Sequence, residues 1–119
     1  MVRNAGAFIV DDDADSLAGL ALLLEGWGYQ VEQAQDGEEA VAKALARRPD
    51  LVSADLVMTG MDGLRLASTI QHESPGLSVI ILTGHATVDS AVAAMKQGIY
   101  DYLTKPVDTR RLRLLIEKA

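Results

Sequence analysis

The chain alternates short apolar runs with segments whose apolar residues recur at helical spacing, and this alternation repeats five times. The expected strands cover residues 7–10, 30–34, 51–54, 77–82 and 100–103. The expected helices cover residues 14–26, 36–48, 64–73 and 88–97, and a last helix runs from 109 to the end. Strands and helices that alternate in this way are typical of a parallel sheet covered by helices on both faces. The sequence therefore predicts a doubly wound α/β fold, written (βα)5.

Local signals refine this prediction. The run at 77–82 is apolar at nearly every position, as expected for a central strand that is covered on both faces. Asp13 and Asp36 precede expected helices and are good N-caps, and Glu39 lies three residues after Asp36, at capping-box spacing. Gly98 is a candidate C-terminal cap. Right-handed crossovers favour a five-stranded parallel sheet in the flavodoxin-like order 2-1-3-4-5.

Composition excludes several classes of function. A chain of 119 residues fits one domain, and the absence of cysteine rules out disulfides and thiolate metal sites. The net charge of −6 disfavours direct binding of nucleic acid, which needs a basic face. No apolar run approaches the roughly 20 residues that would cross a bilayer. We therefore expect a cytoplasmic protein without a membrane partner.

Polar residues gather where the expected strands end. Asp11 and Asp12 follow the first strand, Asp55 the third, Thr83 the fourth and Lys105 the fifth. Ligands of doubly wound sheets bind at this edge. Two carboxylates about 4 Å apart repel by about 4 kcal/mol at an effective dielectric of 20, and a divalent cation such as Mg²⁺ would relieve this repulsion. A half-open Mg²⁺ site beside a lysine favours phosphoryl transfer, with Asp55 as the best-placed nucleophile.

Five short motifs together resemble the response-regulator receiver family of two-component signalling, and the resemblance covers essentially the whole chain. The motifs are residues 9–12 (Ile-Val-Asp-Asp), 50–58 around Asp55, 61–63 (Met-Asp-Gly), 82–85 (Leu-Thr-Gly-His) and 102–106 (Tyr-Leu-Thr-Lys-Pro). Each motif is weak alone, but all five occur together and in this order. The second half is most similar to receivers of nitrogen-regulation-type transcriptional activators.

The resemblance implies a role for each residue of the cluster. Asp55 is the expected phosphoacceptor, and Asp11, Asp12, Asp55 and the backbone carbonyl of Val57 are the expected ligands of Mg²⁺, for which Mn²⁺ can substitute. Two further residues, Thr83 and Lys105, are expected to bind phosphoryl oxygens. Tyr102 corresponds to an aromatic switch residue that moves inward together with Thr83, and Lys105–Pro106 corresponds to a cis peptide bond.

The chain departs from the family pattern in the loop after Asp55. The family usually has proline after the methionine of this loop, but this chain has Thr59 after Met58. Thr59 followed by Gly60 is expected to leave the loop freer than proline would. The side chains of Val57 and His85 also border the expected site, where they can change the access of water to a phosphorylated Asp55.

By this resemblance, residues 1–119 form the receiver domain at the N-terminus of a longer regulator. A sensor histidine kinase would phosphorylate Asp55, and the surface of residues 88–97, 100–103 and the last helix would switch, control an output such as transcription and support a homodimer. The chain is thus expected to be a self-phosphorylating acceptor with Mg²⁺-dependent autodephosphorylation and not a turnover enzyme. One alternative is a Mg²⁺-dependent phosphohydrolase, which would usually carry a second aspartate where this chain has Val57. The other is a receiver-like interaction domain that never needs phosphate.

Overall fold

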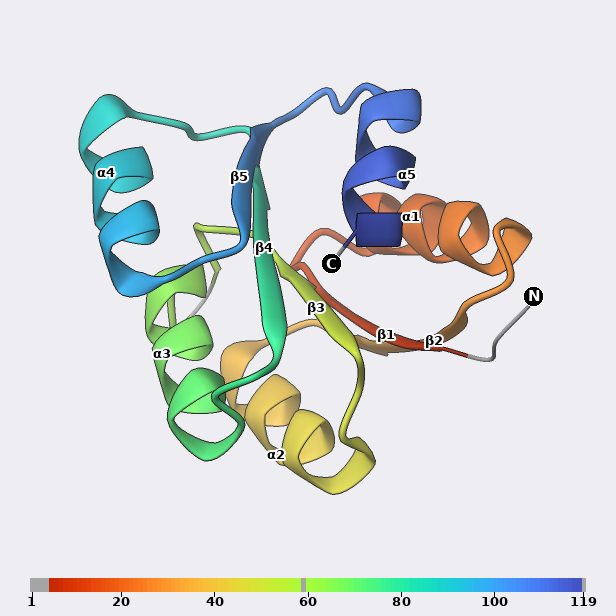
Figure 1. The fold of residues 1–119 in the computed structure, drawn as a ribbon, viewed down its shortest axis with the longest axis horizontal. Coiled ribbons are helices and arrows are strands. Elements are labelled where there is room, and N and C mark those ends of the chain that lie inside the picture. Colours follow the sequence, from red (N-terminus) through yellow and green to blue (C-terminus); the bar gives the residue numbers. More distant parts are fainter. Residues whose placement is uncertain (1–4, 59, 119) are drawn as a thin grey trace.

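A computed structural model describes residues 5–58 and 60–118 and contains one parallel sheet with helices on both faces (Figure 1). The strands are β1 (Gly6–Val10), β2 (Gln30–Ala34), β3 (Leu51–Ala54), β4 (Ser78–Thr83) and β5 (Asp101–Thr104). The helices are α1 (Ala14–Gly26), α2 (Gly37–Arg47), α3 (Gly63–Glu73), α4 (Val88–Gln97) and α5 (Thr109–Lys118). The strand order is β2-β1-β3-β4-β5, so the predicted fold class and strand order are confirmed.

Two layers of helices enclose the sheet. Figure 1 shows α1 and α5 on one face and α2, α3 and α4 on the other. Successive side chains of a strand point to opposite faces, so each strand contributes to both layers. In β4, Val79 and Ile81 pack in the core beneath α2, α3 and α4, whereas Ile80 and Leu82 pack beneath α1 and α5. The apolar run therefore belongs to a strand that is covered on both faces, as predicted.

The expected helix caps are present. The carboxylates of Asp13 and Asp36 accept hydrogen bonds from backbone N–H groups in the first turns of α1 and α2. Asp62, which was not predicted as a cap, does the same for α3. Gly98 ends α4 with a φ of 91°, in the left-handed region that favours glycine. Glu39 differs from the expected capping box, because its carboxylate accepts from the N–H of Gln35 instead of the cap residue.

Boundaries shift by one residue in three of the strands. β1 begins at Gly6, while β4 and β5 begin and end one residue later than expected. Thr83 and Thr104 consequently still pair within the sheet, in register with each other. Within the described residues, no helix combines the length and the apolar character that crossing a membrane requires.

Candidate functional site

Three carboxylates meet at the carboxyl edge of the sheet. The carboxylates of Asp11, Asp12 and Asp55 each offer an oxygen, and these oxygens lie within 4.8 Å of one another. Asp11 and Asp55 are buried, whereas Asp12 is exposed. The sequence therefore located the acidic cluster correctly.

Sheet register explains why Asp11 and Asp55 are neighbours. Val10 of β1 pairs with Ala54 of β3, so the residues that follow them leave the sheet side by side. The N–H of Asp55 donates to the carbonyl of Val10 at 3.0 Å, and the N–H of Asp11 donates to the carbonyl of Ala34 at 3.2 Å. Both carboxylates thus stand on backbone that is held by the sheet.

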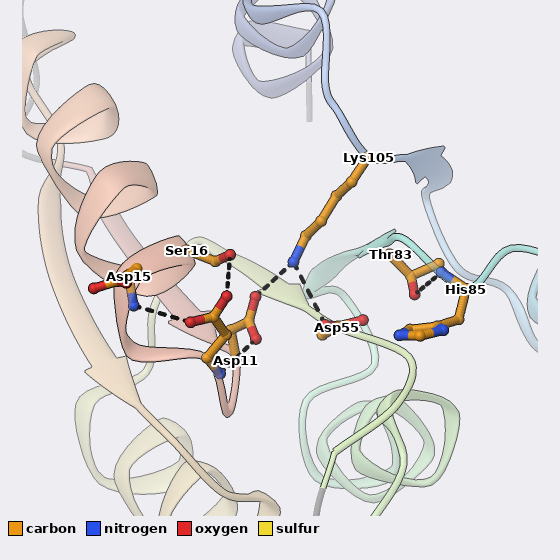
Figure 2. Close-up of polar contacts among 8 residues, drawn as sticks. Asp11, Asp15, Ser16, Asp55, Thr83, His85 and Lys105 are labelled. Atoms are coloured by element: carbon orange, nitrogen blue, oxygen red, sulfur yellow. Dashed lines mark hydrogen bonds and ion pairs between the residues drawn. The ribbon is translucent and has the colours of Figure 1, made fainter.

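Lys105 reaches this pair from beyond the end of β5 (Figure 2). Its Nζ lies 2.6 Å from Oδ2 of Asp11 and 3.5 Å from Oδ2 of Asp55. Burial of the ammonium works to lower the pKa of Lys105, but the hydrogen bonds and charges of Asp11 and Asp55 outweigh it, so the pKa lies above its usual value. Lys105 is therefore a cation held against the two buried carboxylates. The Lys105–Pro106 peptide bond is cis, as the family pattern implies.

One oxygen of Asp55 is buried without a partner in the described part of the chain. Oδ1 of Asp55 is buried and makes no hydrogen bond within the described residues, although a buried carboxylate oxygen normally has one. Three carboxylates with an orphaned oxygen form a hard, oxygen-only donor set, which suits a divalent cation such as Mg²⁺. The residues therefore fit a divalent metal. Val57, whose carbonyl is the fourth expected ligand, follows in the β3–α3 loop and has a half-exposed side chain.

Gly63 controls how closely α3 approaches this loop, a feature that the sequence did not single out. A Cβ at Gly63 would lie 2.2 Å from the carbonyl oxygen of Asp55 and 3.1 Å from Cα of Leu56. The N–H of Gly63 also donates to the carbonyl of Leu56 at 2.8 Å. The start of α3 thus packs directly on the Asp55 backbone, and no side chain fits between them. The Met-Asp-Gly motif carried this signal, because a glycine at a helix start often marks a close backbone approach.

Thr83 stands on the other side of Asp55 from Asp11, in keeping with the strand order (Figure 2). Its side chain is fully buried, and its hydroxyl accepts a hydrogen bond from the N–H of His85 at 3.0 Å. His85 itself is exposed. The expected residue Thr59 lies outside the described residues.

Tyr102 is half-buried on β5, and its hydroxyl lies 2.6 Å from the hydroxyl of Ser90 on α4. No ion pair or hydrogen bond joins it to the carboxylates or to Lys105 within the described part of the chain. Ser90 is a second residue that the sequence missed. The spacing of Thr87 and Ser90, which is that of a capping box, was the signal available for it.

A doubly wound sheet with this edge of carboxylates, lysine and threonine defines a class of signalling domain. The chain belongs to the response regulator receiver domain family, whose pattern matches residues 7–117. Receiver domains are signalling modules of two-component systems and not turnover enzymes.

Two relatives indicate which receivers within the family this chain is similar to. The chain is 40% identical over 113 residues to the nitrogen assimilation regulatory protein NtrX of Azorhizobium caulinodans. It is 44% identical over 117 residues to the transcriptional regulatory protein GlrR of Escherichia coli. These alignments cover 93% and 98% of this chain but only 25% and 26% of the relatives. The chain thus spans about a quarter of the length of these transcriptional regulators, and the expected similarity to nitrogen-regulation-type receivers is confirmed.

Solved structures of receiver proteins have the same fold as this chain. A response regulator receiver domain protein from Clostridium thermocellum superposes with a TM-score of 0.92 at 33% identity, covering 96% of this chain and 92% of that one. NtrX from Brucella abortus, solved in complex with ADP, gives a TM-score of 0.90 at 34% identity and covers 98% of this chain and 27% of that one.

Proposed function

We propose that the chain accepts a phosphoryl group on Asp55 and works as a phosphorylation-dependent switch. The observation that carries this proposal is the buried Asp55 carboxylate, which has Lys105 at 3.5 Å from one oxygen and, among the described residues, no partner for the other. Because Oδ1 makes no hydrogen bond within the described residues, no protein contact of that oxygen has to break before the carboxylate reacts or holds a metal ion.

Asp11, Asp12, Asp55 and the backbone carbonyl of Val57 are the residues that would hold Mg²⁺, and Mn²⁺ can take its place. When bound, the metal ion supplies positive charge that neutralises the oxygens of the transferring phosphoryl group. The cluster contains three carboxylates and one ammonium, so positive charge is what it lacks. Metal binding and phosphorylation should therefore support each other.

In the transfer itself, a carboxylate oxygen of Asp55 attacks phosphorus. A new P–O bond forms while the P–N bond of a phosphohistidine donor breaks, and the imidazole leaves with the electron pair. The donor would be a sensor histidine kinase. Lys105 would bind one phosphoryl oxygen, and the buried hydroxyl of Thr83 would donate to another. Loss of the group by attack of water on phosphorus would complete the cycle.

The rate of that hydrolysis depends on how easily water reaches the phosphoryl group. The side chains of Val57 and His85 are both exposed, and by the resemblance they border the site, as Thr59 does. We propose that these three positions set the lifetime of the phosphorylated state.

Phosphorylation would draw Thr83 toward the new oxygens and leave room for the ring of Tyr102 to move inward. The surface of α4, β5 and α5 would then change, and it would also form the homodimer. To shift such an equilibrium from 1:99 to 99:1 requires about 5.5 kcal/mol of differential binding. Two or three charge-assisted hydrogen bonds, at about 1.5–3 kcal/mol each, would supply a free energy of this size.

The lengths and names of the relatives support a wider proposal. We propose that residues 1–119 are the N-terminal receiver module of a longer, cytoplasmic regulator that controls transcription. Both curated relatives are regulators about four times as long as the aligned segment. With a net charge of −6, this module would not itself bind nucleic acid.

Retardation on a phosphate-binding gel tests the proposal. Acetyl phosphate with Mg²⁺ should retard the wild-type chain, and Asp55→Asn should run unshifted. Asp62→Asn is the matched control, because asparagine caps α3 as well as aspartate does and should leave the retardation intact. Equal retardation of wild type and Asp55→Asn would overturn the proposal.

A further inference from the structure

The N-terminal end of α4 is organised around one hydroxyl. Oγ of Ser90 accepts from the N–H of Thr87 at 3.2 Å, and the N–H of Ser90 donates to Oγ1 of Thr87 at 3.0 Å, which completes a capping box. The same Oγ lies 3.1 Å from the carbonyl of Thr87 and 2.6 Å from the hydroxyl of Tyr102. A hydroxyl has one proton and two acceptor lone pairs, so Oγ of Ser90 can donate to the Thr87 carbonyl while it accepts from the Thr87 N–H and from the hydroxyl of Tyr102. The cap of α4 and the position of Tyr102 are therefore linked.

The C-terminal end of α4 is tied to α3 instead. Nε2 of Gln97 donates to the carbonyl of Leu64 at 2.7 Å, and Nε2 of Gln71 donates to the carbonyl of Gly98 at 3.1 Å. Ile99, which follows the cap residue Gly98, is buried in the core that α3 also covers. None of these three contacts involves Tyr102 or the acidic cluster.

Apolar packing does little to hold the N-terminal half of α4. Ala94 is the buried residue of the helix, and it lies in the C-terminal half. Val88 is 80% exposed, Val92 47% and Met95 54%, so the apolar side chains of the outer face contribute little to anchoring. The bond between Ser90 and Tyr102 is thus a main tether of the first turn to the sheet.

We infer that Ser90 is a positioning residue that fastens the first turn of α4 to Tyr102, so that α4 turns about its C-terminal end when the tyrosine leaves. This inference rests on the proposed switching of Tyr102. Inward movement of the ring withdraws its hydroxyl from Ser90 and loosens the first turn, while Gln97 and Gln71 keep the other end on α3. Of the three exposed apolar residues of α4, Val88 then moves furthest and Met95 least.

Amide hydrogen exchange followed by NMR on the chain without a phosphodonor tests the tether. Tyr102→Phe removes only the hydroxyl and should speed exchange at Ser90 and Ala91 between about twofold and tenfold, the range that one lost hydrogen bond implies. Exchange at Ile99 should stay unchanged. Tyr100→Phe is the matched control, and equal exchange at Ala91 in both variants would overturn the inference.

A second measurement separates positioning from simple helix stability. Ser90→Ala should bind beryllofluoride with Mg²⁺ between about twofold and tenfold more tightly, because it weakens the unphosphorylated arrangement. Ser90→Thr restores the hydroxyl and should restore the wild-type affinity. Weaker binding by Ser90→Ala, or no rescue by Ser90→Thr, would contradict the inference.

NMR of the complex with beryllofluoride and Mg²⁺ tests whether the pivot lies at the C-terminal end of α4. On addition of beryllofluoride to the wild type, the amide resonance of Ser90 should shift strongly, whereas the side-chain amide resonances of Gln97 should barely move. Equal shifts at both ends would refute a pivot at the C-terminal end. A chain that failed to bind beryllofluoride would refute the proposed function, but the exchange experiment uses no phosphoryl analogue and stands apart from that failure.

Discussion

Replacing Asp12 with asparagine should stabilise the fold without metal and destabilise it with metal. The oxygens of Asp11, Asp12 and Asp55 lie within 4.8 Å of one another, and Lys105 supplies one positive charge. The carboxylate of Asp12 is therefore repelled by two carboxylates, and the cluster has one ammonium to offset that repulsion. At 4.8 Å and an effective dielectric of 20, one uncompensated repulsion is about 3.5 kcal/mol. Because Asp12 is exposed, solvent screening reduces the net repulsion to about 1 kcal/mol.

Bound Mg²⁺ reverses the effect of Asp12→Asn on the stability of the fold. A ligand present at 100 times its dissociation constant stabilises the folded state by about 2.7 kcal/mol, and Asp12→Asn should lose most of this stabilisation. Thermal unfolding should thus show the variant melting about 4 °C above wild type in EDTA and below wild type in excess Mg²⁺.

Asp50→Asn serves as the control for lost charge. Asp50 lies just before β3, at the opposite edge of the sheet, where its carboxylate accepts from the N–H of Gly6 at 2.8 Å. Its effect on the melting temperature should be the same in both buffers. If Mg²⁺ raised the melting temperature of Asp12→Asn as much as that of wild type, the assignment of Asp12 to the metal site would be refuted.

Two further substitutions test the backbone and the cation of the site. Gly63→Ala should destabilise the chain by about 2–3 kcal/mol in urea unfolding, since the new Cβ would collide with the carbonyl of Asp55, whereas Gly84→Ala, with open space at its Cβ, should change stability by less than about 1 kcal/mol. Similar costs for both would refute the close-approach argument. Lys105→Met should leave two buried carboxylates without their counter-ion, lowering stability by about 2–4 kcal/mol at neutral pH, and should slow acetyl phosphate labelling. Unchanged stability and labelling would contradict the role of Lys105.

The sheet could be predicted from the sequence because its signals are local. Ile80 and Ile81 are both fully buried on opposite faces, which a continuous apolar run in a parallel strand implies. Strand ends were less certain, since polar residues such as Thr83 and Thr104 pair in the sheet although they interrupt the apolar pattern. Propensity alone cannot decide whether a polar residue at a strand end still pairs.

The site was predictable where strands end and much less so elsewhere. Asp11 and Asp55 are brought together by strand register, which the strand order already implies. The contact of Gly63 with the Asp55 backbone depends on how a helix docks on a loop. The bond between Ser90 and Tyr102 joins a helix start to an edge strand, and only the packed tertiary structure sets that distance.

Reductive trapping of the phosphorylated residue tests the central claim most directly. Borohydride reduces an acyl phosphate to an alcohol, so a phosphorylated aspartate becomes homoserine, which mass spectrometry of peptides can locate. After treatment with acetyl phosphate and Mg²⁺, we expect homoserine at position 55 and unchanged aspartate at positions 11, 12 and 13. Homoserine at any of those three positions, or none at position 55, would contradict the account.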